Sequence, residues 1–141
     1  MGKRLDRNKE WYDVAVIDSG IGEYGRCFRN SYAGQINFIF DEYGAGKIFE
    51  KSYFIGSHVC NVLRVMGKYK NNSKYRYHNY NIVNRNGKSS SSALLKALEY
   101  LQEQDEIDLI VACLSYDSAV YHNEIQRCCS SLRKKENHFY C

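Results

Sequence analysis

The sequence predicts an α/β fold: a three-layer, doubly wound domain built on a mostly parallel sheet of about five strands. Short, continuously apolar runs recur along the chain, as is typical of strands that are buried on both faces. Segments with helical periodicity separate these runs, which indicates right-handed βαβ units. A chain of 141 residues is long enough to bury a real core, so we expect residues 1–141 to form a single domain.

Four apolar runs predict buried strands, and a fifth begins near the end of the sequence. The four are DVAVID at 13–18, INFIF at 36–40, YNIV at 80–83 and IDLIVACLS at 107–115. The fifth is HFYC at 138–141. Their apolar residues are consecutive rather than alternating, which favours a parallel sheet covered on both sides.

Three segments between the strands carry an apolar stripe at the three- and four-residue spacing of a helix. The first is GSHVCNVLRVM, with Val59, Val62, Leu63 and Met66 on the stripe. The second is SSSSALLKALEYLQEQ, which opens with capping serines and carries Leu94, Leu95, Leu98 and Leu101. The third is SAVYHNEIQRCCSSLRKKE, with a weaker stripe of Val120, Ile125, Cys129 and Leu132.

Composition and charge argue against several classes of protein. The net charge of +4 comes from basic residues that are scattered rather than gathered in a dense stripe, so we expect no nucleic-acid partner. No run approaches the roughly 18 apolar residues of a membrane helix, and no apolar segment of a secretory signal follows the charged N-terminus. We therefore expect a cytoplasmic protein with no membrane association.

Cysteine and histidine spacing predicts no metal site. The six cysteines contain no CxxC pair, and Cys60 and Cys113 lie in apolar stretches where a reduced thiol packs as a small hydrophobe. His78 falls in what we interpret as a tyrosine-rich loop, and neither His122 nor His138 has a ligand-spaced Cys or His neighbour.

Two glycine-containing stretches are imperfect matches to nucleotide-binding loops. A phosphate loop needs a glycine five residues before Gly87, where this chain has Ile82. The stretch DEYGAGK at 41–47 lacks both the GxGxxG spacing and a following helix. We expect no cofactor.

The acidic residue at the end of the first strand is the main functional candidate. Ligands of parallel α/β sheets bind beyond the carboxyl ends of the strands, which is where Asp18 falls, with Gly20 and Gly22 just after it. Position alone leaves two interpretations open: a functional carboxylate, or a side chain that caps a turn.

Several segments together resemble the subtilases, the subtilisin-like serine peptidases (peptidase S8). DVAVIDSGI resembles their aspartate motif, and GSHVCNVLRVM resembles the latter part of their histidine motif, HGTHVAG. ALLKALEYLQEQDEIDLIVACLS resembles the family's next helix and strand, which end near a Ser-Leu-Gly that lines the substrate cleft. EIQRCCSSLRKKEN and HFYC are similar to the helix and strand that lead to the oxyanion asparagine.

The resemblance assigns roles by position, and several positions depart from the family pattern. Asp18 matches the catalytic aspartate, but Ile55 stands where the catalytic histidine belongs. His58 matches the second, non-catalytic histidine; a shift of three residues would instead make His58 the base. The substrate-cleft positions are Cys113, Leu114 and Ser115 in place of Ser-Leu-Gly. The oxyanion asparagine and the Gly-Thr-Ser nucleophile motif would both come after residue 141.

These departures predict a catalytically incompetent, subtilisin-like domain, because an acid alone cannot activate a hydroxyl. We expect it to bind a peptide or protein partner, or to form a homo-oligomer through an exposed sheet edge, in the setting of bacterial peptide maturation. The alternative is the N-terminal portion of a split or truncated serine endopeptidase, with the asparagine and serine supplied by a second chain.

Overall fold

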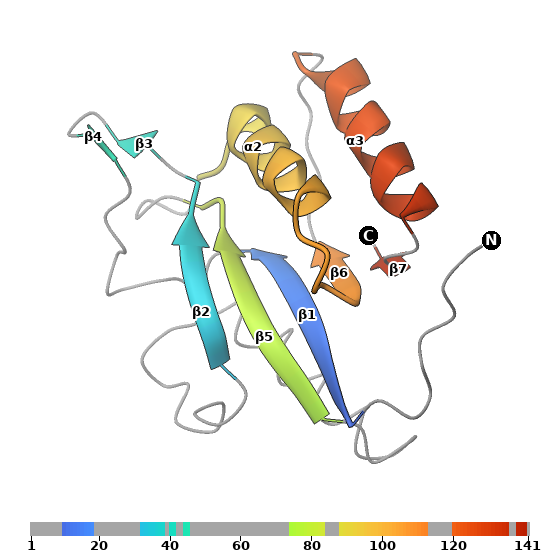
Figure 1. Cartoon of the computed structure of the whole chain (residues 1–141). Coiled ribbons are helices and arrows are strands. Elements are labelled where there is room, and N and C mark those ends of the chain that lie inside the picture. Colours follow the sequence, from blue (N-terminus) through green and yellow to red (C-terminus); the bar gives the residue numbers. More distant parts are fainter. Residues whose placement is uncertain are drawn as a thin grey trace.

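In the part of the chain that the structure describes, the fold is an α/β arrangement with a five-stranded sheet and two helices (Figure 1). The computed structural model describes residues 10–18, 32–38, 40–41, 44–45, 74–83, 88–112, 120–135 and 138–140. The strands of the sheet are β1 (Trp11–Asp18), β2 (Tyr32–Asn37), β5 (Lys74–Asn81), β6 (Leu109–Ala112) and β7 (His138–Tyr140). The helices are α2 (Ser91–Gln102) and α3 (His122–Lys134), and a small separate hairpin pairs β3 (Phe40–Asp41) with β4 (Gly44–Ala45).

The strand order is β2-β5-β1-β6-β7, and every pair of neighbours in this sheet is parallel. β1 therefore lies at the centre, between β5 and β6. After β1 the chain continues to β2, toward one edge of the sheet, and after β6 it continues to β7, toward the other edge. This reversal of direction between two neighbouring strands defines a topological switch point at the carboxyl ends of β1 and β6.

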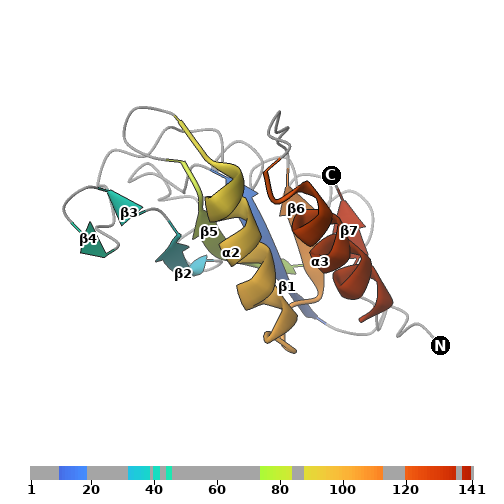
Figure 2. The ribbon, with the colours of Figure 1, turned by 90° about the horizontal axis from the view of Figure 1, so that it is seen from above.

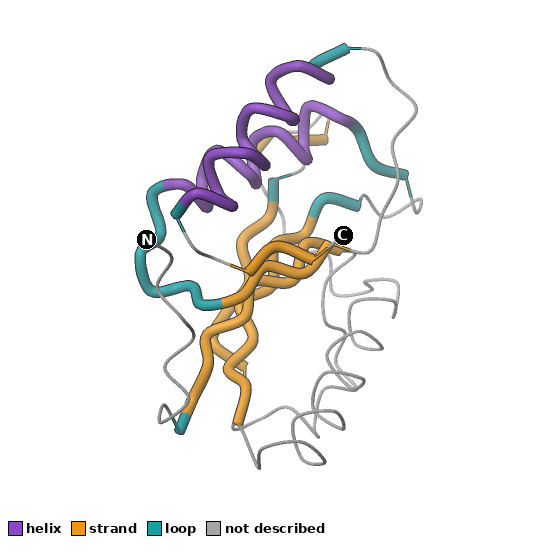
Figure 3. The backbone as a smooth tube through the Cα atoms, turned by 90° about the vertical axis from the view of Figure 1, so that its right-hand side faces the viewer, coloured by secondary structure: helices purple, strands orange, loops and turns teal. Residues whose placement is uncertain are grey.

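Both described helices cover the same face of the sheet (Figures 2 and 3). Apolar residues of β1, β5 and β6 that point to this face form one continuous core with α2 and α3. Its members include Ala15, Ile17, Tyr80, Ile110, Leu94, Leu98, Leu101, Ile125 and Leu132. Burying this face is the main reason that the sheet and the helices hold together, because each alone would expose its apolar side.

The opposite face of the sheet is also shielded from solvent. Val14, Val16 and Tyr77 alternate with the helix-facing residues of their strands, and each has no exposed surface. Burial on both faces is what the continuous apolar sequence of β1 predicts. The second helix layer of the expected three-layer fold, including the helix predicted at 56–66, falls outside the described residues and stays a prediction.

The predictions of α2 and α3 are confirmed. Ser90 is the N-cap of α2, and its hydroxyl accepts a hydrogen bond from the backbone N–H of Ala93 at 3.2 Å. In α3 the buried stripe consists of Ile125, Cys128 and Leu132. Val120, expected on that stripe, is instead 60% exposed because it precedes the helix. Cys128 is a reduced thiol whose pKa is raised by burial.

Several strand boundaries differ from the sequence prediction, and those of β2 and β5 differ most. β2 begins at Tyr32 and ends at Asn37, whereas the apolar run predicted 36–40. β5 begins at Lys74, six residues before the predicted start, so the prediction that His78 lies in a loop is wrong. The amino half of β5 extends beyond the helices, and its helix-side residues are therefore polar and partly exposed. A half-strand in which polar and apolar residues alternate in this way does not form an apolar run in the sequence.

Neither of the two described helices is long and apolar enough to cross a membrane.

Candidate functional site

Asp18 ends the central strand at the topological switch point, as the sequence predicts. Its side chain is on the face away from the helices, like Val14 and Val16, and only 7% of the residue is exposed. The strand end is fixed by its neighbour, since the carbonyl of Asp18 accepts a hydrogen bond from the backbone N–H of Ile82 at 3.1 Å. The carboxylate is thus held on a rigid support at the edge where ligands of parallel sheets bind.

Amide side chains occupy the register positions beside Asp18. Asp18 pairs with Asn81 of β5, and Asn81 pairs in turn with Asn37 of β2. The Oδ1 atom of Asn81 accepts a hydrogen bond from the backbone N–H of Val83 at 3.1 Å, which fixes the side chain in a turn. Asn81 is almost fully buried, so this amide belongs to the support of the site rather than to its surface.

A second amide pair lies two residues earlier on β5 and β2. The Nδ2 atom of Asn79 donates to Oε1 of Gln35 at 2.8 Å, and the two residues are register partners. Asn79 has no exposed surface. These amides are absent from the site predicted by the sequence pattern. The signal was nonetheless present, because two asparagines alternate with tyrosine and isoleucine in a stretch that otherwise predicts a buried strand.

The other residues assigned from the sequence lie outside the described part of the chain. They are Ile55, His58, Cys113, Leu114 and Ser115. The substrate-cleft assignment begins one residue after Ala112, whose register partner is Ile17, the residue before Asp18. The pairing of an imidazole with Asp18 and the lining of the cleft therefore stay predictions.

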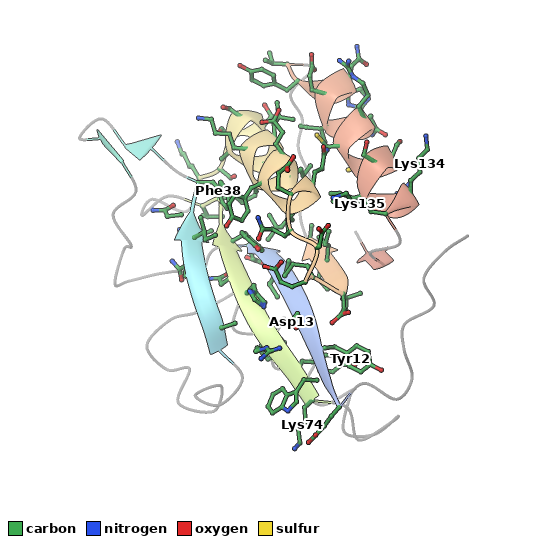
Figure 4. All side chains as sticks on the ribbon, viewed as in Figure 1. Tyr12, Asp13, Phe38, Lys74, Lys134 and Lys135 are labelled. Carbon is green, nitrogen blue, oxygen red and sulfur yellow. The ribbon has the colours of Figure 1, made fainter. Side chains whose placement is uncertain are left out.

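A second polar cluster lies near the amino end of the sheet, on the helix-side face below α2 (Figure 4). Asp13, which is only 5% exposed, accepts hydrogen bonds from Arg76 Nε at 2.8 Å and Arg76 Nη2 at 2.9 Å. His78 Nε2 is 2.7 Å from Asp13 Oδ1. The backbone N–H of Asp13 donates to Asp108 Oδ2 at 2.8 Å, which adds the residue before β6 to the cluster.

Electrostatics keeps the Asp13 carboxylate charged. Burial raises the pKa of Asp13, but the hydrogen bonds from Arg76 and His78 and the electrostatic interactions with these two residues outweigh burial, and the net effect is a lowered pKa. Sequence analysis did not predict this cluster, because Asp13 was interpreted as the start of an apolar run and His78 as a loop residue.

The Asp13–His78 pair is separate from the Asp18 site. Five residues along a strand span roughly 17 Å, and the two aspartates point to opposite faces of the sheet. The bidentate guanidinium also neutralises Asp13, so we interpret the cluster as a structural junction of β1, β5 and the residue that precedes β6. Among the described residues, no group of His, Cys, Asp or Glu side chains could hold a metal ion.

The fold and the position of Asp18 define the structural class of this protein. It is a parallel α/β domain with a buried carboxylate at its topological switch point. No protein-family model and no curated protein sequence matches the chain. Among solved structures it is similar to the prenylagaramide maturation protease PagA, with a TM-score of 0.62 and 14% sequence identity. The match covers 95% of this chain and 46% of that chain, so this chain spans less than half the length of the protease. The likeness shows that the two proteins share this α/β fold.

Proposed function

We propose that this chain is a subtilisin-like domain that binds a peptide or protein segment without cutting it. The observation that carries the proposal is the location of Asp18, the residue that matches the subtilase aspartate, at the switch point of a sheet shared with a maturation protease. A rigid carboxyl edge with a partly polar floor suits recognition of an extended peptide, whose main chain supplies regularly spaced donors and acceptors.

Loss of catalysis follows from the residue in the place of the base. Ile55 cannot accept a proton, so Asp18 has no histidine to orient at that position. In enzymes with this triad, removal of the base alone lowers kcat on the order of a million-fold. Binding depends on the shape and hydrogen bonds of the cleft rather than on proton transfer, and can persist after such a loss.

We extend the proposal to the partner. The similar structure is a protease of prenylagaramide maturation, and a binding domain on this fold would hold a peptide precursor or another protein of such a pathway in a bacterial cytoplasm. Association through β7 is a further route to a partner or to a homo-oligomer, because within the described residues β7 pairs only with β6 and forms one edge of the sheet.

Binding without cleavage is tested with a hexapeptide library. Immobilised protein is incubated with peptides randomised at every position, and retained and unretained peptides are sequenced by mass spectrometry. We expect a retained subset with a defined sequence preference and no shortened products. Retention equal to that on heat-denatured protein would refute peptide binding, and shortened products would refute the absence of catalysis.

The alternative is the N-terminal portion of a serine endopeptidase, and the 46% coverage of the similar protease favours it as the second candidate. A fluorophosphonate probe distinguishes the two functions. The binding domain remains unlabelled both alone and with co-purifying proteins. Labelling that requires this chain together with a second polypeptide would support the endopeptidase, and an Ile55→His variant should then increase the labelling rate.

A further inference from the structure

We infer that Val120 and Tyr121 determine the sequence preference of the bound peptide by contacting one of its apolar side chains. This inference rests on the proposed peptide-binding function. Both residues lie on the connection that leaves β6 and enters α3. Figure 1 shows α3 beginning on the side of the sheet toward which the strand arrows point, and Asp18 ends β1 on that side.

The first observation is exposure. Val120 is 60% exposed and Tyr121 is 42% exposed, and with Tyr100 they are the exposed large hydrophobic residues of the described chain. The two are consecutive, so together they present an apolar surface rather than isolated contacts. Exposed, polar or charged residues follow immediately in the first turn of α3, namely His122, Asn123 and Glu124. An apolar centre with a polar rim is the usual composition of a recognition surface.

The second observation is the backbone of Tyr121. Its φ of 64° and ψ of 9° place it in the left-handed region, and it is the one described residue other than glycine with a positive φ. Glycine or asparagine adopts this conformation at lower cost than tyrosine does. The carbonyl of Tyr121 still accepts the first hydrogen bond of α3, from the backbone N–H of Ile125 at 2.9 Å, so the conformation is fixed by the helix.

Tyrosine at position 121 is therefore unfavourable for the stability of the fold. Tyr121 is also the N-cap residue of α3, and its side chain makes no capping hydrogen bond, whereas asparagine is among the best N-cap residues. A large aromatic residue in a strained and uncapped position, with much of its surface in water, is explained when the ring contacts a ligand. Asp18 faces away from the helices and Tyr121 begins a helix on the other face, so a peptide that contacts both would cross the carboxyl edge of the sheet. Six extended residues span roughly 20 Å, which is the scale of such a crossing.

The chemistry of the site specifies the ligand class. Tyrosine and valine offer an apolar surface with a single hydroxyl, so they select a Leu, Ile, Met, Phe or Tyr side chain rather than a charged one. Differences of this kind in an apolar contact correspond to at least about ten-fold in affinity. We therefore expect the retained hexapeptides to have an apolar residue at one fixed position.

The test compares two tyrosine variants. In Tyr121→Asn the preference at the apolar position should be lost and affinity for a retained peptide should fall about ten-fold, while the unfolding midpoint stays the same or rises. The matched control is Tyr100→Gln, which removes a tyrosine of similar exposure on α2. Because Tyr100 contacts Phe38 and Tyr80, the control should unfold more easily and retain peptides normally.

The outcomes separate this inference from the proposed function. If the wild-type protein retains no peptide, the proposed function itself is wrong. If it retains peptides but Tyr121→Asn retains the same ones with equal affinity, the role of Tyr121 is refuted while peptide binding stands. A lower unfolding midpoint in Tyr121→Asn would show that the tyrosine serves the fold, which also contradicts the inference.

Discussion

The guanidinium of Arg76 donates to both carboxylate oxygens of Asp13, from Nε at 2.8 Å and from Nη2 at 2.9 Å. The Asp13 side chain is nearly buried, whereas half of the Arg76 side chain is exposed. Planar, bidentate pairs of this kind are the strong ion pairs of proteins. This pair joins the two central strands β1 and β5 at their amino ends, where the helices no longer cover the sheet.

Replacing Asp13 with asparagine should destabilise the protein by about 2 kcal/mol. Removing one partner of a fully buried pair costs about 3–5 kcal/mol, and the half-exposed Arg76 lowers that cost because water solvates the remaining charge. Urea unfolding measures the change. The control is Glu10→Gln, which breaks the neighbouring Glu10–Lys74 pair at 2.8 Å. Both side chains of that pair are largely exposed, so we expect no measurable effect.

The same carboxylate should make stability depend on pH in the acid range. The pKa of Asp13 is lower in the folded protein than in the unfolded chain, so its stabilising contribution is complete above the unfolded pKa. That contribution is lost as pH falls through the folded pKa. We expect the unfolding free energy to decrease between about pH 5 and pH 2, and the decrease to be smaller in Asp13→Asn. If the unfolding free energy of the wild-type protein and of Asp13→Asn decreased equally with falling pH, Asp13 would not be the source of the pH dependence.

Tyr80 should produce the opposite dependence in the alkaline range. Its ring packs between Phe38 and Tyr100, with centroids 5.7 Å and 5.9 Å away. Burial raises the pKa of Tyr80, and the charges of Tyr100 and Glu106 raise it further. A phenol that ionises more readily in the unfolded chain destabilises the fold as pH rises above about 10. Tyr80→Phe should unfold like wild type near neutral pH and lose less stability above that value, with Tyr121→Phe as the exposed control.

The cap of α2 gives a local prediction. Ser90 accepts the Ala93 N–H with its hydroxyl, and alanine cannot. Ser90→Ala should therefore lower the free energy of unfolding by about 1 kcal/mol. Ser92→Ala is the matched control, because Ser92 lies inside the helix, where alanine has the higher helix propensity. Equal losses in the two variants would show that the hydroxyl of Ser90 does not act as a cap.

The sequence predicted elements whose burial is uniform, and it predicted only the apolar part of those whose burial changes along their length. The stretch from Val14 to Ile17 in β1 and the buried face of α2 are entirely apolar, so their pattern identifies them directly. β5 is covered by the helices in its carboxyl half only, and its amino half therefore alternates Lys74, Arg76 and His78 with tyrosines. No local pattern distinguishes such a half-strand from a polar loop.

The site was predictable to the same limited extent. Asp18 could be placed from β1 alone, because an acid at the carboxyl end of a buried strand has a defined location in a parallel sheet. Its neighbour Asn81 could not, since the two residues are brought together by the register of β1 and β5. Register depends on contacts between segments far apart in the sequence, and composition and periodicity do not report it.

The buried amide pair allows a test of whether the polar row beside Asp18 serves the fold. Asn79 is fully buried and donates to Gln35 at 2.8 Å, so it cannot contact a ligand directly and should act through stability. Asn79→Leu and Gln35→Met should each lower the free energy of unfolding by about 1–3 kcal/mol, because each substitution removes the hydrogen-bond partner of the other amide. The double variant should lose about 1 kcal/mol less than the sum of the single losses, since no orphaned amide remains. Additive losses would show that the two amides are not coupled.

If the double variant folds but no longer retains peptides, the pair positions the binding edge as well as supporting the sheet.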